Sequence, residues 1–303
     1  MQEMLYDISE IMIGGKDMNI LSKLQNESHR FSKGQRAIAR YILDYYDKAA
    51  FMTANTLGKV VGVSESTVVR FAMELGYDGY PQMQKALQEM VVNRLTSVQR
   101  IGAMGDRLGN QDILSMVIQS DMEKLRQTAE LVSRQDFHAA VDAILNARRV
   151  FILGVRSTAP LANFLGYYLG QMLDTVHTVT ASGNSAVFEQ VISVDERDAV
   201  IAFSFPRYST STARGAEFCR SKGAKVIGIT DSLGSPLGRN CDHVLLAKSD
   251  MISLVDSLTA PLSIANALIV AIAAKREREL EKKFSELESL WERYHVYEKQ
   301  GEA

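Results

Sequence analysis

Hydroxyl side chains gather in three short segments of the second half of the chain, at residues 156–158, 204–212 and 230–232. Each segment directly follows an apolar run that is typical of a buried strand. Loops at the carboxyl ends of parallel strands bind ligands in open α/β sheets, and the N-terminus of the following helix attracts an anion. The pattern predicts a site for a small phosphorylated, polyhydroxylated metabolite, although serine and threonine also serve simply as helix caps. The predicted ligand-binding residues are Arg156, Ser157, Thr158, Ser204, Arg207, Ser209, Ser211 and Thr230.

A second pattern, between residues 58 and 75, suits a helix that reads DNA. Gly58 leaves room for a second helix to approach, and Gly62 stands where a tight turn favours a positive φ. Ser64 follows as the N-cap of the next helix, with its hydroxyl able to accept from the backbone N–H groups of the first turn. Apolar residues from Val68 to Leu75 recur on one face of that helix. The combination predicts a helix-turn-helix unit.

A helix that presents its N-terminal turn to the major groove places small hydroxyl residues near base edges and phosphates. Arg70 would reach a guanine or a phosphate, and Val69 would touch a thymine methyl group. The alternative is a helical hairpin that binds nothing and whose polar residues are merely solvated. The predicted DNA-binding residues are Ser64, Glu65, Ser66, Thr67, Val69, Arg70, Lys59, Lys33 and Arg36, the last three as phosphate contacts.

Two kinds of elements must position these residues. Between residues 32 and 80 the apolar spacing of three and four predicts helices alone, and Pro81 suits the first turn of a further helix to about Val92. After Phe137, short β-rich runs alternate with helical stretches, which indicates a parallel sheet with both faces covered. We expect strands at Val150–Val155, Thr175–Thr180, Ala199–Ser204, Lys225–Ile229 and His243–Leu246, and helices at 111–131, at 210–222 with Gly223 past its end, at 262–274 as a buried helix, and at 275–297 as a charged tail.

The fold class expected is therefore two-domain, with an all-α helix-turn-helix domain followed by a flavodoxin-like, three-layer α/β domain. A glycine-containing polar stretch at 97–110 reads as a linker. The predicted divisions are an N-terminal extension (1–17), the DNA-binding domain (18–96), the linker with its connecting helix (97–132), the ligand-sensing domain (133–276) and a C-terminal helical tail (277–303).

Composition excludes several classes of protein. The chain of 303 residues carries a net charge of −2, but residues 18–100 carry +4, which is weak support for a nucleic-acid partner. Two cysteines could form at most one disulfide, which would do little to stabilise a chain of this size. The N-terminus also lacks the basic and then apolar segments of a secretory signal peptide, so we expect a reduced cytoplasmic protein. The longest apolar stretch is too short to span a bilayer, and we expect no membrane association.

Other chemistries find little support. Among the two cysteines and the five histidines, only Cys241 and His243 are close in sequence, and two ligands make a weak site, so we expect no metal and no cofactor. Neither a GxGxxG dinucleotide fingerprint nor a GxSxG nucleophile elbow occurs. The main alternative is a phosphosugar isomerase or lyase on the same fold, with Glu189 or His177 as the base. A protein-interaction module without DNA affinity is a further alternative.

From about Asn19 to Tyr297 the sequence resembles the RpiR-type transcriptional regulators, which join a helix-turn-helix domain to a sugar-isomerase (SIS) domain. The resemblance lies in 31–36, in 62–71, in the Gly76-Tyr77 and Gly79-Tyr80 pairs, in 151–154, in Ser204 with Ser209, and in 229–232. It implies that Thr158, Ser204 and Ser209 occupy positions that hold phosphate in SIS domains. Two departures stand out, since Arg156 replaces a usual second glycine and Pro206-Arg207-Tyr208-Ser209 replaces a frequent Ser-Gly-x-Thr turn. Each arginine would bind the phosphate, fill the pocket or pair with an acid.

The resemblance and the residues together indicate a regulator of carbohydrate metabolism that is not an enzyme. Its partners would be double-stranded operator DNA and a phosphorylated sugar or related anionic effector. Because helix-turn-helix proteins usually read two half-sites, we also expect a homodimer or a higher homo-oligomer.

Overall fold

The computed structural model describes residues 20, 23–24, 30–92, 112–180, 184–249 and 255–297. It divides the chain into two compact units, Met1–Gly102 and Ala103–Ala303. The expected extension at 1–17 and most of the expected linker lie outside the described residues. The finer domain boundaries given above stay predictions. Among the described helices, none combines the length and the apolar character that a membrane crossing requires.

The N-terminal unit is helical, as expected. Its elements are α2 (Lys33–Asp44), α3 (Tyr46–Ala49), α4 (Ala54–Val61), α5 (Glu65–Glu74) and α6 (Tyr80–Val92). Ser32 and Gln35 form a capping box that starts α2, because each side chain accepts from the other residue's backbone N–H. Fully buried side chains from four of these helices make one core: Ile38, Ile42, Leu57, Val68, Phe71, Met83 and Leu87.

The C-terminal unit contains a five-stranded parallel sheet in the order β2-β1-β3-β4-β5. Val150 of β1 lies level with Val176 of β2 and Ala199 of β3. The three central strands are almost completely buried, which explains their unbroken apolar sequence. The strands are β1 (Val150–Leu153), β2 (Val176–Val179), β3 (Ala199–Phe203), β4 (Lys225–Thr230) and β5 (His243–Leu246).

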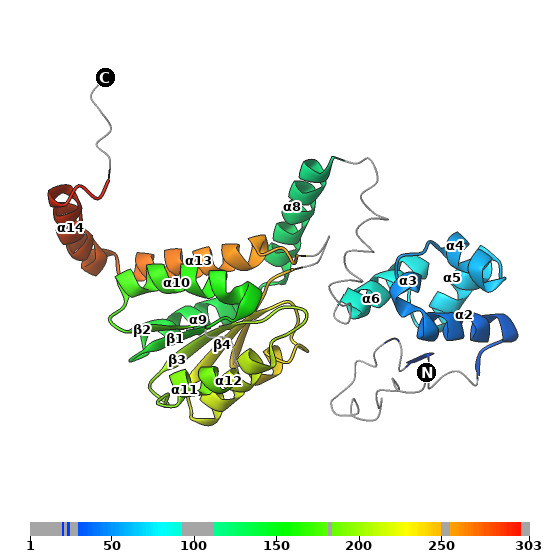
Figure 1. Cartoon of the computed structure of the whole chain (residues 1–303), viewed down its shortest axis with the longest axis horizontal. Coiled ribbons are helices and arrows are strands. Elements are labelled where there is room, and N and C mark those ends of the chain that lie inside the picture. The colour runs from blue at the N-terminus through cyan, green and yellow to red at the C-terminus, as the bar shows by residue number, and fades with distance from the viewer. Residues whose placement is uncertain are drawn as a thin grey trace, which may run out of the picture. The chain divides into compact units, whose positions relative to one another are not determined.

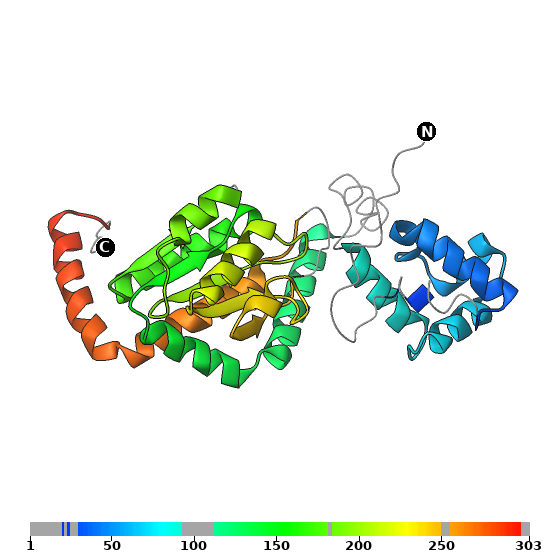
Figure 2. The same ribbon diagram turned by 90° about the horizontal axis from the view of Figure 1, so that it is seen from below.

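Helices cover both faces of this sheet, which confirms the three-layer fold (Figures 1 and 2). One core cluster joins the sheet to α9 (Arg134–Leu145), α10 (Ala159–Met172) and α13 (Thr259–Lys275). The other joins it to α11 (Asn184–Val191) and α12 (Thr210–Ser221). The expected stop of α12 is confirmed, since Gly223 follows it with a φ of +87°.

Two expectations about the helices need correction. The stretch around 262–274 is not buried all round. Ile264, Leu268 and Ile272 on one side of α13 face the core of the domain, whereas Val270 on another side is 67% exposed. The charged tail is not one helix from 275, because α13 continues to Lys275 and α14 (Glu277–Arg293) starts after Arg276. The helix expected at 111–131 is α8 (Ile113–Leu131), capped by Asp112.

Candidate DNA-binding helix and ligand site

The helix α5 has one buried face and one exposed face, as its sequence predicts. Val68, Phe71 and Ala72 have no exposed surface, and Phe71 meets Phe31 edge to face with ring centroids 5.2 Å apart. The face is thus fixed by apolar burial and aromatic contact. Its opposite side, which includes Arg70 and Met73, is exposed.

The turn before α5 depends on two glycines in different ways. Gly62 ends α4 in the left-handed region, with φ +79° and ψ 34°, and no atom lies near the place that a Cβ would take. Gly58 is buried, and a Cβ there would lie 2.8 Å from the carbonyl oxygen of Val63. The first glycine therefore supplies a backbone conformation, and the second allows the two helices to approach closely.

The N-terminal turn of α5 carries a small cluster of hydroxyl groups. The Ser64 hydroxyl accepts from the backbone N–H of Thr67 at 3.3 Å, as expected for an N-cap. Its oxygen also lies 2.9 Å from that of Ser66 and 2.8 Å from that of Thr67. Glu65 is exposed beside them, and Val69 is half-buried one turn further on. The Arg70 side chain is exposed and its Nε donates to the carbonyl oxygen of Ser66 at 3.4 Å.

The predicted phosphate contacts are exposed on two neighbouring helices. Lys59 lies on α4, and Lys33 and Arg36 lie in the first turn of α2. A Cβ on Gly34 would lie 3.3 Å from Val63 and 3.8 Å from Thr67, so this turn of α2 adjoins the start of α5. The fold thus brings the first turn of α2 beside the turn of α5 that carries Ser64 and Thr67.

In the C-terminal unit, the three hydroxyl-bearing loops leave adjacent parallel strands at the same edge of the sheet. The first loop follows β1 and forms a short 3₁₀ turn at Arg156–Thr158 before α10. Arg156 and Ser157 are exposed, whereas Thr158 is buried. The Thr158 hydroxyl approaches two carbonyl oxygens, of Val155 at 3.0 Å and of Phe203 at 3.3 Å. Through these contacts the Thr158 hydroxyl links the loop after β1 to the last residue of β3.

The second loop contains two buried hydroxyl groups without a hydrogen-bond partner in the described part of the chain, those of Ser204 and Thr212. Ser204 is 2% exposed and Thr212 is not exposed at all. Between them, the Ser209 hydroxyl caps α12 by accepting from the backbone N–H of Thr212 at 3.3 Å. Ser211 is half-buried in the first turn of the same helix. Buried polar groups are nearly always paired, so these two hydroxyls stand out as groups that can still form a hydrogen bond.

The third loop follows β4 and adds a carboxylate that the sequence argument did not select. The Tyr208 hydroxyl donates to both oxygens of Asp231, at 2.9 and 3.0 Å. Thr230 is fully buried, and its hydroxyl lies 3.2 Å from Asp231 and 3.0 Å from Ser235. Burial raises the pKa of Asp231 above its ordinary value. The second and third loops are therefore joined by a partly buried polar network.

Two arginines in these loops have an uncommon backbone conformation. Arg156 has a φ of 56° and Arg207 a φ of 64°, both in the left-handed region that favours glycine. For a residue with a Cβ this conformation costs roughly 1–2 kcal/mol. These are the two positions at which the sequence departs from the expected glycines. The fold thus keeps the glycine-type loop shape and adds an exposed cation to each loop.

Several residues at this edge carried no signal in the sequence that marks them as site residues. Thr212 reads as an ordinary helix residue, and only its burial without a partner singles it out. Tyr208 and Asp231 lie 23 residues apart in sequence, so nothing local predicts their contact. Lys248 lies just past β5. Its positive charge lowers the pKa of Asp231, but less than the hydrogen bonds to this carboxylate do.

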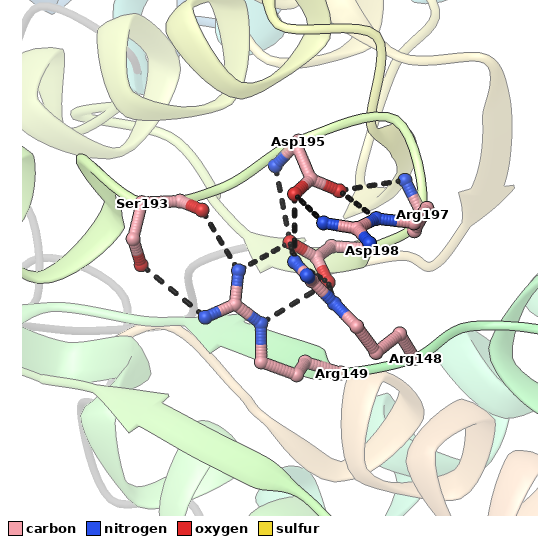
Figure 3. Close-up of polar contacts among 6 residues, drawn as sticks. All are labelled: Arg148, Arg149, Ser193, Asp195, Arg197 and Asp198. Atoms are coloured by element: carbon pink, nitrogen blue, oxygen red, sulfur yellow. Dashed lines mark hydrogen bonds and ion pairs between the residues drawn. The ribbon is translucent and has the colours of Figure 1, made fainter.

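The opposite edge of the sheet holds a dense cluster of charges, shown in Figure 3. The Asp198 side chain is fully buried and accepts from Arg149 at 2.7 Å and from Arg148 at 2.9 Å. The backbone N–H of Asp195 also donates to it at 3.0 Å. Burial works to raise the pKa of Asp198, but the hydrogen bonds from Arg149, Arg148 and Asp195 outweigh it and lower the pKa to about 2. The cluster is satisfied within itself and joins the starts of β1 and β3.

The residues considered for other chemistries lie elsewhere. His177 is exposed on β2, where its ring stacks on Phe151 at 4.9 Å, and Glu189 is exposed on α11. Cys241 donates to the carbonyl oxygen of Leu237, and His243 faces Asp136 at 3.4 Å. In the ranges that the structure covers, no three metal-ligand side chains come together.

Both units of the chain match families of known proteins. Residues 18–94 match the model of a helix-turn-helix domain of the rpiR family, and residues 143–271 match the SIS domain model. The HTH-type transcriptional regulator HexR of Pseudomonas aeruginosa is 24% identical over 85% of this chain and 90% of its own length.

Two solved structures are similar to the chain. The sugar isomerase domain of an RpiR transcription factor from Sphaerobacter thermophilus is 27% identical, with a TM-score of 0.56, over 59% of this chain and 99% of that one. The Vibrio vulnificus NanR protein, solved in complex with ManNAc-6P, is 20% identical with a TM-score of 0.55, over 90% of this chain and 98% of that one.

Proposed function

Because this chain belongs to the RpiR family of helix-turn-helix regulators and carries a SIS domain, we propose that it binds operator DNA through α5 and responds to a phosphorylated sugar. The sugar would bind at the carboxyl edge of the parallel sheet and change the affinity for DNA. Such a protein regulates the transcription of genes for carbohydrate metabolism and acts in the cytoplasm, where the DNA is. It is a regulator rather than an isomerase, since its relatives are curated as transcriptional regulators.

The observation that carries the ligand proposal is the pair of buried hydroxyls, Ser204 and Thr212, on either side of the N-terminus of α12. A phosphate at this place would accept from both hydroxyls and from the open backbone N–H groups of the first helical turn. Arg156 and Arg207, exposed in the adjoining loops, would add positive charge. The relative NanR was solved with the phosphosugar ManNAc-6P, which supports a ligand of the same class here.

The sugar hydroxyls would meet the polar network of the third loop. Asp231 already accepts from Tyr208 and Thr230, and carboxylate oxygens have capacity for further donors. The sugar end of the ligand would therefore lie toward Asp231 and the phosphate toward Ser204. Ser157, Ser209, Ser211 and Thr230 complete the proposed site, with Thr158 and Ser209 shaping loops through bonds they already make.

DNA reading by α5 is tested with Arg70→Ala, on fragments first selected from genomic DNA by the intact protein at low salt. We expect the affinity for the selected site to fall by roughly 1–3 kcal/mol in a gel-shift titration, because Arg70 would lose a contact with a base. Lys85→Ala is the control, since it removes an exposed charge from α6 of the same unit. Unchanged affinity for Arg70→Ala would remove this residue from the interface.

The phosphate contacts are tested by their dependence on salt. Lys33→Ala and Arg36→Ala should weaken specific and unrelated DNA alike, because phosphates carry no sequence information. Each should also lower the slope of log affinity against log salt by about one. A loss confined to the specific site would show that these residues read bases instead.

A further inference from the structure

The carboxyl edge of the parallel sheet is divided in charge. The loops after β1 and β3 each carry an exposed arginine, Arg156 and Arg207. The loop after β4 carries the opposite charge, on Asp231. Because β1, β3 and β4 are neighbours in the sheet, the two positive loops and the negative loop follow one another along this edge. A small ligand that matches the edge electrostatically has an anionic group at one end and a cationic group at the other.

The carboxylate of Asp231 is paired with no cation among the described residues. Hydroxyl groups hold it instead, since both oxygens accept from Tyr208 at 2.9 and 3.0 Å and one oxygen also accepts from Thr230 at 3.2 Å. Burial raises the pKa of Asp231, and the charge of Lys248 acts against this without forming an ion pair. A partly buried carboxylate is stabilised by a partner that brings a positive charge. The third loop therefore has a place for a cation.

Tyr208 adds a second hydrogen-bond acceptor at this end of the site. Its hydroxyl uses its one proton on Asp231, so its oxygen has only lone pairs left for a ligand. Burial and the negative charge of Asp231 raise the pKa of Tyr208, which keeps the proton in place. An ammonium group has three donors and no acceptor, so it suits two groups that both accept. A sugar hydroxyl would also donate there, but it would leave the charge of Asp231 without a partner.

We infer that the effector is an amino-sugar phosphate, whose ammonium group binds between Asp231 and Tyr208 while its phosphate binds at Ser204 and Thr212. The inference rests on the proposed function, because it assigns the far end of the same ligand in the same site. Asp231 is then the residue that determines specificity. It favours a free amine over the hydroxyl of a plain sugar phosphate, and over an N-acetyl group, whose nitrogen has no charge and a single proton.

Binding of matched sugar phosphates to the full-length protein tests the ammonium group. Each set contains an amino-sugar 6-phosphate, the parent sugar 6-phosphate and the N-acetyl form, in the glucose, galactose and mannose series. Calorimetric titration is done at neutral pH, where the amine is mostly protonated. We expect one amino-sugar phosphate to bind roughly tenfold more tightly than its parent and its N-acetyl form, since a hydrogen bond to a charged group is worth about that factor.

The other outcomes separate this inference from the proposed function. If sugar phosphates bind but no amino member binds more tightly than its parent, the inference is overturned and the proposed function stands. If no member of any set binds, the sugar-phosphate site is overturned, and the inference with it.

The variant Asp231→Asn tests whether this carboxylate is the source of the preference. The amide keeps an oxygen that accepts from Tyr208 but has no charge, so amino and parent sugar phosphates should bind within about twofold of each other. Asp242→Asn is the matched control and should keep the native preference, because Asp242 is a half-buried aspartate just before β5, at the opposite edge of the sheet. A native preference in Asp231→Asn would overturn the inference. If this variant folds poorly, the comparison of ligands on the native protein still decides.

Discussion

At the scale of single residues, the hydroxyls of Ser204 and Thr212 are the observation that favours a ligand site over a set of helix caps. Ser209 caps α12 and Thr158 bonds to two carbonyls, so these residues serve the fold already. Ser204 and Thr212 do not, since their buried oxygens have no partner in the described ranges. An unsatisfied buried polar group costs about 1–3 kcal/mol. A ligand that supplies the partner would recover that cost and add binding energy.

Ser204→Ala separates the two roles. Without ligand, we expect thermal unfolding at the same temperature or slightly above, because no hydrogen bond is lost. The rise in melting temperature that a sugar phosphate gives the native protein should disappear. Thr158→Val is the comparison, and should lower stability by about 1 kcal/mol because its hydroxyl is bonded. A normal ligand-induced rise in Ser204→Ala would place the effector elsewhere.

Asp198 makes the stability of the C-terminal unit depend on pH. Its pKa is lowered to about 2 in the folded state, against an ordinary value of 3.8. The stabilisation is therefore complete above pH 4 and is lost as the pH falls toward 2, in total about 2 kcal/mol. Asp198→Asn should remove this part of the acid dependence in urea titrations at several pH values. It should also destabilise the unit near pH 7 by about 3–5 kcal/mol, because Arg148 and Arg149 lose their buried partner.

At the scale of elements, the distance between α4 and α5 is set at Gly58. A methyl group there would meet a backbone oxygen at 2.8 Å, and backbone cannot move aside as a flexible side chain would. We expect Gly58→Ala to destabilise the N-terminal unit by about 1–3 kcal/mol and to weaken DNA binding, because α5 would shift.

Gly79→Ala is the control for Gly58→Ala in the same unit. A methyl group at residue 79 would meet only Pro81 at an ordinary contact distance of 3.7 Å. Denaturation followed by circular dichroism, together with gel shifts, measures both effects. Similar losses of stability and of DNA affinity in the two variants would mean that any new side chain is harmful in this unit. The close approach of the helices at Gly58 would then not explain the effect.

At the scale of the whole molecule, a regulator must couple its two units. Such coupling is a free energy shared by two sites, and it is typically about 1–3 kcal/mol. If the sugar phosphate changes the affinity for operator DNA by some factor, the operator must change the affinity for the sugar phosphate by the same factor. Titrating each ligand in the absence and presence of the other checks this equality. Unequal factors would show that a third equilibrium, such as self-association of the chain, takes part.

Much of this protein could be predicted from sequence because the relevant signals are local. Apolar periodicity placed α4 and α5, and Ser64 and Gly62 marked the turn between them, since caps and positive φ depend on a few adjacent residues. The five strands were predicted within two residues at each end, because buried parallel strands have continuous apolar runs. The small helices α3 and α11 had too few periodic positions to be predicted, and α13 looked buried because its apolar composition hides which side faces solvent.

The sequence by itself determined the two domain types, the helix that we propose to face DNA and the three loops that meet at one edge of the sheet. Only the tertiary structure decided which hydroxyls in those loops are already bonded and which are buried without a partner. It also decided that Tyr208 meets Asp231, that Arg156 and Arg207 adopt glycine-like backbone, and that α14 leaves its domain. The physical reason is that hydrogen-bond satisfaction and burial depend on residues far apart in the chain, whereas propensity and capping depend on neighbours.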